Sequence, residues 1–593
     1  MTLLTEEDHR PGTKLCGALW RDLSKPLGNK TRRLLLAVAG SNRVRLPKLT
    51  TLRRTSQIVF FLLFLFLLLK TEFRGSLHSS AADVSIPYPV RLFFQIDPLL
   101  AVQNALSSRA LYHGLLWCLI VLIPTLFLGR FFCGWICPLG SVHHFFGSLK
   151  SDRKRGKRLL ESNRYKPWQT TKYYLLIAGL VAALLGSGIL GWLDPIALLV
   201  RLLALSILPA TDYALSAVLR AMEHSRLASV QTVGSMSHFA LGSWLLTFKQ
   251  VYFRQAVWLG LIFIFLVALN FRITRFWCRA LCPLGALLGI VSRWSVLGLV
   301  KHAEHCKDCD RCLLHCQGGD DPIGGVPWRQ AECHLCLNCV ADCPEGGLQF
   351  KFFAAQESLG ANLPRRKVLT GLLAGAAVVP LLRSTPGFAV QRNERLLRPP
   401  GALDEDYFLS RCIRCGECMR VCPNNALQPA LDEAGLEGLW TPILVPRIGY
   451  CETSCVLCSQ VCPSGAIWEI TSQEKGWAAA GPPADKPIHI GTAFYDRGRC
   501  MPWAMATECI VCEEWCPTSP KAIYLQPAQV VTADGNVKLV RQPYLDPSRC
   551  VGCGACEHAC PVEDHPAIYV TSIGETRSRT NQFLLNRGKE KAK

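Results

Sequence analysis

Twenty-four of the 30 cysteines in this 593-residue chain fall into six groups of four. Four groups have the spacing C-x2-C-x2-C-x3-C: Cys306, Cys309, Cys312 and Cys316; Cys333, Cys336, Cys339 and Cys343; Cys412, Cys415, Cys418 and Cys422; and Cys550, Cys553, Cys556 and Cys560. The group Cys451, Cys455, Cys458 and Cys462 begins with C-x3-C, and the group Cys500, Cys509, Cys512 and Cys516 begins with an eight-residue gap. Runs of four thiols at such spacing are typical of iron–sulfur ligands.

The spacing has a physical reason in the shape of a [4Fe–4S] cubane. Three thiolates on a tight loop reach different irons of one cubane, and the fourth thiolate points toward a second cluster. Groups that are close together should therefore exchange their last ligands. This rule predicts six [4Fe–4S] clusters with the following ligands: Cys306, Cys309, Cys312 and Cys343; Cys333, Cys336, Cys339 and Cys316; Cys412, Cys415, Cys418 and Cys462; Cys451, Cys455, Cys458 and Cys422; Cys500, Cys509, Cys512 and Cys560; Cys550, Cys553, Cys556 and Cys516. Zinc is the rival metal, but it needs two well-separated pairs of ligands rather than an unbroken run of four.

Four more cysteines lie in two copies of a second motif. The copies are RFFCGWICPLG at 130–140 and RFWCRALCPLG at 275–285, identical at seven of 11 positions, and they contain Cys133, Cys137, Cys278 and Cys282. Three interpretations stay open: the four thiols bind a further cluster, they form a redox-active dithiol, or they pack as small apolar residues. Cys16 and Cys118 have no partners in the sequence and are predicted to be ordinary residues.

Motifs for other redox cofactors are missing from the sequence. It contains no C-x-x-C-H for covalent haem, no G-x-G-x-x-G and no P-loop, and the predicted membrane spans contain one histidine, His113, too few for a bis-histidine haem. No haem, flavin or nucleotide is therefore expected, and no catalytic residue is predicted. The sequence indicates an electron-transfer component and leaves open whether the chain is itself an enzyme.

The elements that carry these cysteines include a membrane part. Half of the residues are hydrophobic and the mean hydropathy is +0.21. Apolar runs without acidic residues predict four transmembrane helices, at 56–70, 111–129, 173–192 and 252–271.

The basic residues are unevenly distributed. Lys and Arg exceed Asp and Glu by 21; 12 basic residues lie in 1–55 and ten in 130–172, beside the apolar runs. Because cytoplasmic loops are rich in Lys and Arg, both stretches are predicted to be cytoplasmic. This distribution favours a membrane protein over a nucleic-acid-binding one.

The predicted fold class is a membrane α-helical part joined to α+β bacterial dicluster ferredoxin-like domains. The predicted domains are a basic cytoplasmic N-terminus (1–55), a membrane domain (56–300), a cytoplasmic dicluster ferredoxin (301–350), a signal or fifth span (364–385), a four-cluster ferredoxin domain (400–570) and a tail (571–593). The membrane domain is duplicated as helix, Asp-Pro loop, helix and cysteine motif, with Asp97 and Asp194 expected to start turns and helices. Residues 200–253 are predicted to form amphipathic helices on the outer surface.

An internal segment resembles an export signal. PRRKVLTGLLAGAAVVPLL at 364–382 places paired arginines before an apolar run, and GFA at 387–389 is similar to a cleavage site. A run of about 15 residues is short for a hydrocarbon core of ~30 Å, so a fifth span needs bilayer thinning or help from Arg383. The plain alternative is a buried or surface helix with an incidental arginine pair. The charge bias around the run predicts that 400–570 lies outside.

The motifs resemble those of two bacterial electron-transfer families. Residues up to about 350, with two RF-x-C-x3-CPLG ends and a dicluster ferredoxin, resemble the NapH-type membrane quinol dehydrogenase subunit. From about 364 onward, RRKVL, GLWTPILVPRIGYCETSCVLCSQVCPSGAI and DRGRCMPWAMATECIVCEEWCPTSPKAI resemble the NapG/MauM ferredoxin-type proteins, including their two irregular cysteine spacings. The chain is thus similar to a fusion of the two.

The resemblance implies a function that the spacing does not show. It implies an inner-membrane protein that passes electrons from quinol to a periplasmic reductase or cytochrome, with the 400–593 part exported folded through the twin-arginine route. Folded export agrees with a domain whose fold depends on its clusters. Two alternatives stay open: electron supply for maturation or reactivation of a periplasmic metalloenzyme, and relay from a cytoplasmic ferredoxin.

Overall fold

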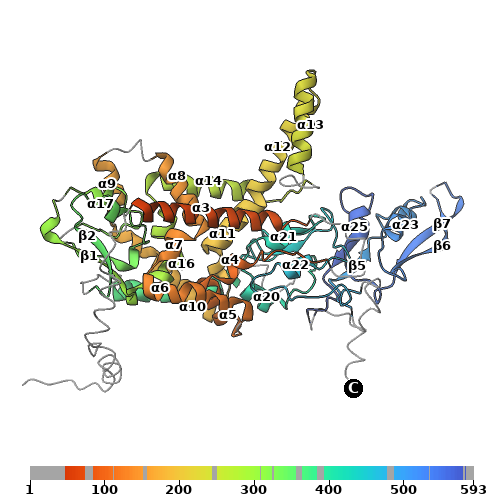
Figure 1. Ribbon diagram of the computed structural model, residues 1–593. Helices are drawn as coiled ribbons and strands as arrows, with labels where there is room; N and C mark the ends of the chain where they lie inside the picture. The colour runs from red at the N-terminus through yellow and green to blue at the C-terminus, as the bar shows by residue number, and fades with distance from the viewer. Residues whose placement is uncertain are drawn as a thin grey trace, which may run out of the picture. The chain divides into compact units, whose positions relative to one another are not determined.

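The computed structural model describes residues 47–73, 84–110, 112–150, 156–242, 250–307, 309–323, 326–354, 363–383, 393–476, 487–532, 534–578 and 581 (Figure 1). The chain divides into two compact units, and every contact discussed below lies within the second, Leu52–Lys593. Most of the basic N-terminus (1–46), the GFA sequence at 387–389 and residues 582–593 of the tail lie outside the described residues.

The first part of the chain is helical. Its helices are α3 (Pro47–Lys70), α4 (Leu92–Gln95), α5 (Pro98–Ser108), η1 (His113–Cys118), α6 (Leu119–Leu128), α7 (Phe131–Trp135), α8 (Pro138–Lys150), α9 (Lys157–Asn163), η2 (Pro167–Thr170), α10 (Thr171–Leu184), η3 (Ile189–Trp192), α11 (Pro195–Leu202), the π-helical turn η4 (Leu203–Ile207), α12 (Leu208–Glu223), α13 (Ala228–Gly242), α14 (Ala256–Arg272), α15 (Phe276–Ala280), α16 (Pro283–Val291) and η5 (Ser292–Trp294).

The later part contains short helices and one long one, α19. They are η6 (Ala303–His305), α17 (Arg311–Leu314), η7 (Gln330–Glu332), α18 (Asn338–Ala341), α19 (Arg365–Arg383), α20 (Glu405–Arg411), α21 (Glu417–Arg420), α22 (Leu457–Gln460), α23 (Met501–Ala504), α24 (Val511–Glu514) and α25 (Ala555–Ala559).

Four antiparallel strand pairs accompany the cysteine-rich segments. They are β1 (Leu297–Lys301) with β2 (Leu348–Phe352), β3 (Leu427–Pro429) with β4 (Pro442–Leu444), β5 (Thr492–Tyr495) with β8 (Ile568–Thr571), and β6 (Ile523–Val531) with β7 (Val537–Leu545). The pair β1–β2 brings the two ends of the 301–350 segment together, with Leu299 opposite Phe350. The cysteine groups of 306–343 and 500–560 therefore lie between paired strands, β1 and β2 in the first case and β5 and β8 in the second, whereas the groups 412–422 and 451–462 flank the pair β3–β4.

Helix α3 reaches a cysteine-rich segment at each end. Near its start, the Arg53 guanidinium lies 3.4 Å from Gln317 Oε1 and 3.3 Å from Asn338 Oδ1. Near its end, Arg420 Nε donates to the Leu68 carbonyl at 2.9 Å. Figure 1 shows α3 running from the β1–β2 segment toward α21 and α22. At 1.5 Å per residue, its 24 residues extend about 36 Å, longer than a hydrocarbon core of ~30 Å.

The two Asp-Pro sequences start helices, as predicted. Asp97 accepts a hydrogen bond from the Leu99 N–H at the start of α5, and Asp194 accepts from Ile196 and Ala197 at the start of α11. In both helices proline occupies the first turn, where its missing N–H costs nothing. The duplication is therefore visible in matching helix starts.

Only some of the predicted spans are long helices. Among the described residues, two helices are long and apolar enough to cross a membrane, Leu49–Lys70 and Pro195–Glu223; His113–Leu128 and Ala256–Arg272 are apolar but shorter. Length and composition alone give weak support, since core helices of soluble proteins pass the same test. The four-helix membrane domain therefore stays a prediction.

Two segments differ from the sequence-based expectation. The predicted span 173–192 becomes the shorter helix α10 followed by η3, because the helix ends at Leu184 and the chain turns at Gly186 with φ 82°. Residues 200–253 are predicted to form amphipathic helices on the outer surface, but α11, η4 and α12 form one continuous apolar helix, Pro195–Glu223, that includes the first part of this stretch. The residues of α11 and the first four of η4 are buried.

The twin-arginine segment forms a helix that packs along α10. A Cβ atom on Gly375 of α19 would lie 2.4 Å from the Ala178 carbonyl oxygen, and one on Gly371 would lie 3.5 Å from that of Tyr174. Small residues four apart let two helices approach closely, a packing common between membrane helices. At the far end of α19, Arg383 pairs with Glu437 at 2.8 Å.

Candidate iron–sulfur centres

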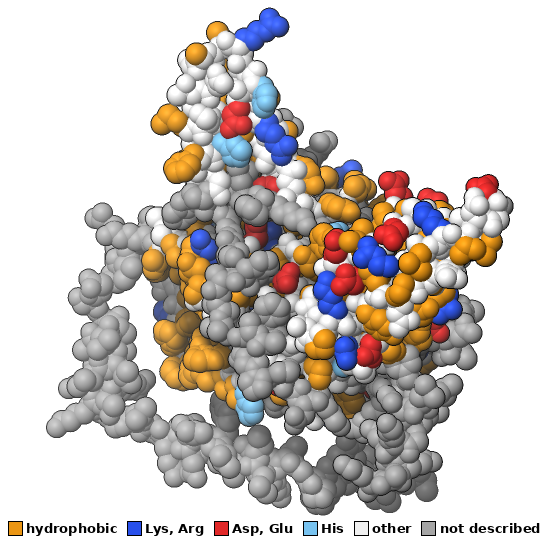
Figure 2. Space-filling model, turned by 90° about the vertical axis from the view of Figure 1, so that its right-hand side faces the viewer, with side chains coloured by type: hydrophobic (Ala, Val, Ile, Leu, Met, Phe, Trp, Pro, Cys, Tyr) orange, Lys and Arg blue, Asp and Glu red, His pale blue; other side chains and the backbone are white. Residues whose placement is uncertain are grey.

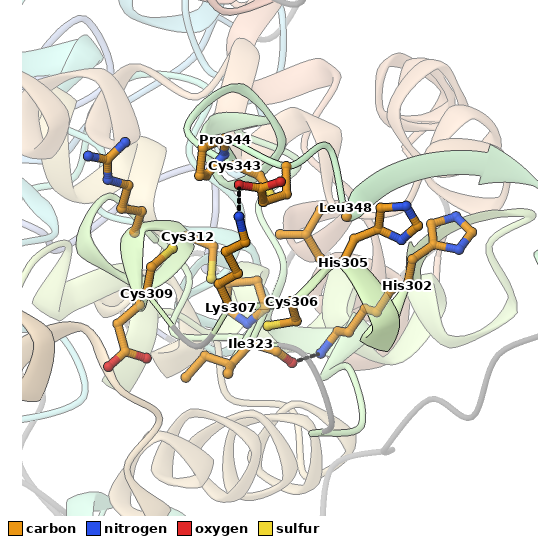
Figure 3. A pocket seen from close by; sticks show the side chains of 16 residues that line it. His302, His305, Cys306, Lys307, Cys309, Cys312, Ile323, Cys343, Pro344 and Leu348 are labelled. Atoms are coloured by element: carbon orange, nitrogen blue, oxygen red, sulfur yellow. Dashed lines mark hydrogen bonds and ion pairs between the residues drawn. The ribbon is translucent and has the colours of Figure 1, made fainter.

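One predicted ligand set lines a single cavity in the 301–350 segment. Cys306, Cys309, Cys312 and Cys343 surround it together with His302, His305 and Leu348 (Figure 3). Cys306 and Cys309 are exposed, and none of the four forms a disulfide. The cavity combines three cysteines of one group with the last cysteine of its neighbour, which is the exchange that the spacing predicts.

Three further cavities are lined by cysteines in the same way. Their cysteines are Cys412, Cys415, Cys418 and Cys462; Cys500, Cys509, Cys512 and Cys560; and Cys516, Cys550, Cys553 and Cys556. Among the described residues, no group of three or more His, Cys, Asp or Glu side chains is close enough to hold a single metal ion. The thiols stand instead around cavities with mainly apolar walls, which fits a cluster between the sulfurs. That they hold cubanes stays a prediction.

The two remaining predicted sets are those around Cys458 and Cys339, and in each of them the thiols lie close to one another. Burial raises the pKa of Cys458, and the neighbouring charges of Cys451, Cys455 and Cys422 raise it further. Burial likewise raises the pKa of Cys339, with contributions from Asp320 and Cys336, and Cys336 also acts on Cys316. The members of both sets therefore lie within electrostatic reach of one another.

Four of the six cysteine groups have a left-handed residue directly after their second cysteine. Gly416 and Gly554 directly follow the second cysteine of their groups and have φ values of 89° and 86°. Leu337 occupies the equivalent position in a third group with φ 61°. Glycine adopts this conformation without steric cost, whereas leucine does not. The left-handed turn is thus shared by these groups whatever the residue type, but the two irregular groups lack it, since Val456 and Ile510 at the same position have φ values of −123° and −120°.

Several residues that contact the ligands were not predicted from the sequence. Lys475 Nζ lies 3.3 Å from Cys451 Sγ, and Tyr495 Oη lies 3.3 Å from Cys512 Sγ. Asp320 Oδ1 accepts from the Cys316 thiol at 2.6 Å and Asp320 Oδ2 from Trp328 Nε1 at 3.2 Å. No motif marks these positions, because packing and not local spacing brings them to the sulfurs.

The cysteine sets of residues 412–560 follow one another through direct contacts. The first, around Cys412, docks on the helices that follow the Asp-Pro loops: Asn104 donates to the Ser464 carbonyl at 2.9 Å and Ser107 to that of Ser410 at 2.7 Å. The Cys451 N–H donates to the Cys553 carbonyl at 2.8 Å, which joins the second set to the third. The third set, around Cys553, and the fourth, around Cys509, each take three cysteines from one of the groups 500–516 and 550–560 and one cysteine from the other.

The repeated RF-x-C-x3-CPLG motif contacts the 301–350 segment. Trp135 Nε1 donates to the Leu335 carbonyl at 3.0 Å, and a Cβ on Gly134 would lie 2.1 Å from the His334 carbonyl oxygen. Cys133, Cys137, Cys278 and Cys282 are all buried beside this contact. Cys118, also buried, lies near Asp97 instead and so outside this group.

Two family models match the chain. A 4Fe-4S binding domain matches residues 110–158 and 255–301, the two copies of the repeated unit. A 4Fe-4S dicluster domain matches residues 411–466 and 491–563. Ferredoxin-type 4Fe–4S domains are therefore present. No solved structure matches the chain.

Several known proteins are similar to this chain over a large part of their own length. The methylamine utilization ferredoxin-type protein MauM of Methylorubrum extorquens is 34% identical over 211 residues, 33% of this chain and 84% of that protein. The ferredoxin-type protein NapG of Escherichia coli K12 is 34% identical over 180 residues, 30% of this chain and 71% of that protein. The putative electron transport protein YccM of the same strain is 25% identical over 270 residues, 45% of this chain and 64% of that protein. The chain is thus an iron–sulfur electron-transfer protein that belongs to the NapG/MauM family of ferredoxin-type proteins.

Proposed function

We propose that this protein is a membrane-bound electron carrier that takes electrons from quinol and delivers them, through [4Fe–4S] clusters, to a periplasmic reductase or cytochrome. In this proposal it joins a NapH-type membrane part to a NapG/MauM-type part. The 24 cysteines of the six groups are the proposed ligands of six clusters. The relatives belong by name to Nap and Mau systems, which suggests redox partners.

The observation that carries the proposal is the separation of two cluster-bearing segments by α3. Arg53, near its start, contacts the 301–350 segment, and Leu68, near its end, contacts the 400–570 domain. If α3 spans a bilayer, the segments lie at opposite faces. The proposed orientation puts the N-terminus and 301–350 in the cytoplasm and 400–593 in the periplasm, with α19 as a retained signal or fifth span.

The outer domain offers a route and an exit for electrons. Its four cysteine sets follow one another from the helices α5 and α11 to the 500–516 group. Figure 2 shows one face of the molecule, where hydrophobic side chains lie among both basic and acidic ones. Exposed large hydrophobic residues of this domain include Met505 and Trp515, on either side of the partly exposed Cys509. A small mixed patch beside the last set suits a transient redox partner.

Anaerobic reduction of the purified full-length protein by a quinol analogue tests the function. We expect the clusters to be reduced on a turnover timescale, as followed by EPR and visible absorbance. Clusters that dithionite reduces but quinol does not would contradict the proposal and favour a role in maturation of a periplasmic metalloenzyme.

A variant separates the quinol route from relay by a cytoplasmic ferredoxin. In Cys306→Ala/Cys309→Ala/Cys312→Ala, the cluster set closest to the cytoplasm is removed. If a soluble ferredoxin is the natural donor, this variant loses reduction by ferredoxin but keeps reduction by quinol. Under our proposal, wild-type protein is reduced by quinol and not by a soluble ferredoxin.

A further inference from the structure

Helices α12 and α13 form a hairpin that stands out from the neighbouring helices. Figures 1 and 2 both show it rising away from them, with the turn at 224–227 near its tip. The two helices approach closely, since a Cβ on Gly234 of α13 would lie 2.9 Å from Met222 Cβ of α12. Beside this contact, His238 Nδ1 lies 2.7 Å from Glu223 Oε1. The hairpin is thus one unit held together by its own contacts.

The chain enters and leaves the hairpin at the 400–570 domain. Before α12, Arg201 Nη1 of α11 donates to the Arg414 carbonyl at 3.2 Å. After α13, Gln255 Nε2 donates to the Pro429 carbonyl at 3.0 Å. Apolar length alone would let the helix that contains α12 cross a bilayer, but the chain returns to the domain that it left. These contacts indicate that the hairpin stays on the side of that domain.

The direction of the hairpin agrees with this placement. In Figure 1, α3 runs toward α21 and α22, and the hairpin rises steeply across that direction near the same end of α3. Its helices have 16 and 15 residues. At 1.5 Å per residue they extend about 24 and 22 Å, less than a hydrocarbon core of ~30 Å. If α3 spans the bilayer, the hairpin therefore lies along the membrane surface instead of crossing it.

The helix beside the base of the hairpin has exposed aromatic and apolar residues. Ser206 Oγ, just before α12, donates to the Ala256 carbonyl at the start of α14 at 2.6 Å. The next two side chains of α14, Val257 and Trp258, are 74% and 69% exposed. Tryptophan is enriched where a membrane meets water. An exposed apolar surface thus continues from the membrane helix α14 to the base of the hairpin.

The two long sides of the hairpin differ in chemical character. At about 100° per residue, one side of each helix is apolar and the opposite side is polar. The apolar side contains side chains that are more than half exposed, namely Val218, Val233, Met236 and Phe239. The polar side contains exposed basic and amide side chains, namely Arg220, His224, Gln231 and His238. Figure 2, seen from the end where the 400–570 domain lies, shows charged and histidine side chains on the near side of the hairpin and hydrophobic ones at its edge.

We propose that the α12–α13 hairpin lies on the outer leaflet of the membrane, with its apolar side in the lipid and its polar side toward water. This inference rests on the membrane placement in the proposed function. Amphipathic helices bind a bilayer surface in this way, through their buried apolar area. Lipid suits the apolar side better than a protein partner does, because the exposed surface continues onto α14. Since Arg414 lies between Cys412 and Cys415, the hairpin would hold the first cysteine set of the 400–570 domain at the membrane surface.

Labelling by a photoactivatable lipid tests this placement. The full-length protein is reconstituted into phosphatidylcholine vesicles that contain an aryl-diazirine phosphatidylcholine, irradiated, and mapped by tandem mass spectrometry. We expect adducts on α3 and on α13 near Met236 and Phe239, and none on the β6–β7 pair. Labelled α3 with unlabelled α13 would overturn the hairpin proposal alone and would favour a second copy or another protein as its partner. Absence of label from both helices would overturn the membrane placement as well.

A pair of double variants tests which side of the hairpin binds lipid. Met236→Asn/Phe239→Asn removes two apolar side chains and should reduce the labelling of α13 at least about tenfold, relative to α3 in the same protein. Gln231→Asn/Ser235→Asn changes the polar side and should keep the wild-type labelling. The label on α3 shows that each variant is inserted. Equal losses in both double variants, or no loss in the first, would contradict the proposal.

Discussion

At the scale of single residues, polar groups beside the cysteines control the proposed clusters. The Lys475 ammonium donates to the carbonyls of Glu452 and Cys455 and lies 3.3 Å from Cys451 Sγ. Burial disfavours this charge, but the Cys451 and Cys455 thiolates raise the pKa of Lys475, which therefore stays protonated. A fixed positive charge next to one ligand favours the reduced cluster.

Replacing Lys475 by Met should therefore lower one cluster potential. The expected shift for the Cys451 set is ~60 mV, a tenfold change in the equilibrium constant for one electron. An EPR redox titration measures it, with Lys538→Met, on the exposed side of β7, as the matched control. An equal shift in both variants would show that Lys475 has no particular effect.

A second residue-scale feature is the buried ion pair around Glu405. Its carboxylate accepts from Arg577 Nη1 at 2.8 Å and from Arg398 Nε at 3.2 Å. Burial alone would raise its pKa, but the two arginines lower the pKa of Glu405 from 4.5 to about 2. Because the folded-state pKa is the lower one, this stabilisation is complete above pH 4.5 and is lost as the pH falls toward 2.

Glu405→Gln should lower the unfolding free energy by about 3 kcal/mol at pH 7, because it leaves the buried Arg398 guanidinium without its carboxylate, whereas Arg577 keeps its ion pair with Glu575. Urea unfolding followed by tryptophan fluorescence measures the loss. The difference from wild type should shrink below pH 4.5, where Glu405 takes up a proton in the unfolded chain, and should be lost near pH 2, where the folded protein takes it up as well. Glu508→Gln, whose partner Arg541 is exposed, should cost less than about 1 kcal/mol at either pH.

At the scale of elements, the contact between α10 and α19 decides whether the twin-arginine segment is part of the membrane domain. Gly375 has no room for a side chain, since Ala178 lies against it. Ala374, one residue earlier, is exposed on the other side of α19. Helix α19 therefore packs on α10 through one face only. A substitution at Gly375, on that face, should destabilise the protein more than the same substitution at Ala374.

Gly375→Leu should push α19 away from α10 and destabilise the protein by about 1–3 kcal/mol. Ala374→Leu adds a side chain of the same size on the exposed face and should leave stability nearly unchanged. The thermal midpoint in detergent compares the two variants. Similar midpoints would mean that α19 does not pack on α10 in the protein as isolated.

At the scale of the whole molecule, the placement of the cluster-bearing segments at the two ends of α3 has a topological consequence. With α3 across the bilayer, only one of the two segments can face the periplasm. Protease added to spheroplasts should cut within 400–570 and leave 301–350 intact, as detected by antibodies against each segment. Permeabilised cells, in which both segments are cut, provide the control. Full protection of 400–570 would contradict the external placement.

The sequence by itself determined the local features of this protein. The spacing of each cysteine group limits which thiols can reach one cluster, so the set Cys306, Cys309, Cys312 and Cys343 could be predicted before its cavity was seen. Asp97 and Asp194 were recognised as helix starts for the same reason, because capping depends on neighbours two or three residues away.

Only the tertiary structure decided which distant groups meet. Nothing local places Arg275 on the Cys133 carbonyl or Lys475 beside Cys451. These arrangements depend on the packing of many side chains from distant parts of the chain, so they cannot be predicted from any single stretch of sequence. The cysteines that share a cavity could thus be predicted from spacing, whereas the groups around these cysteines could not.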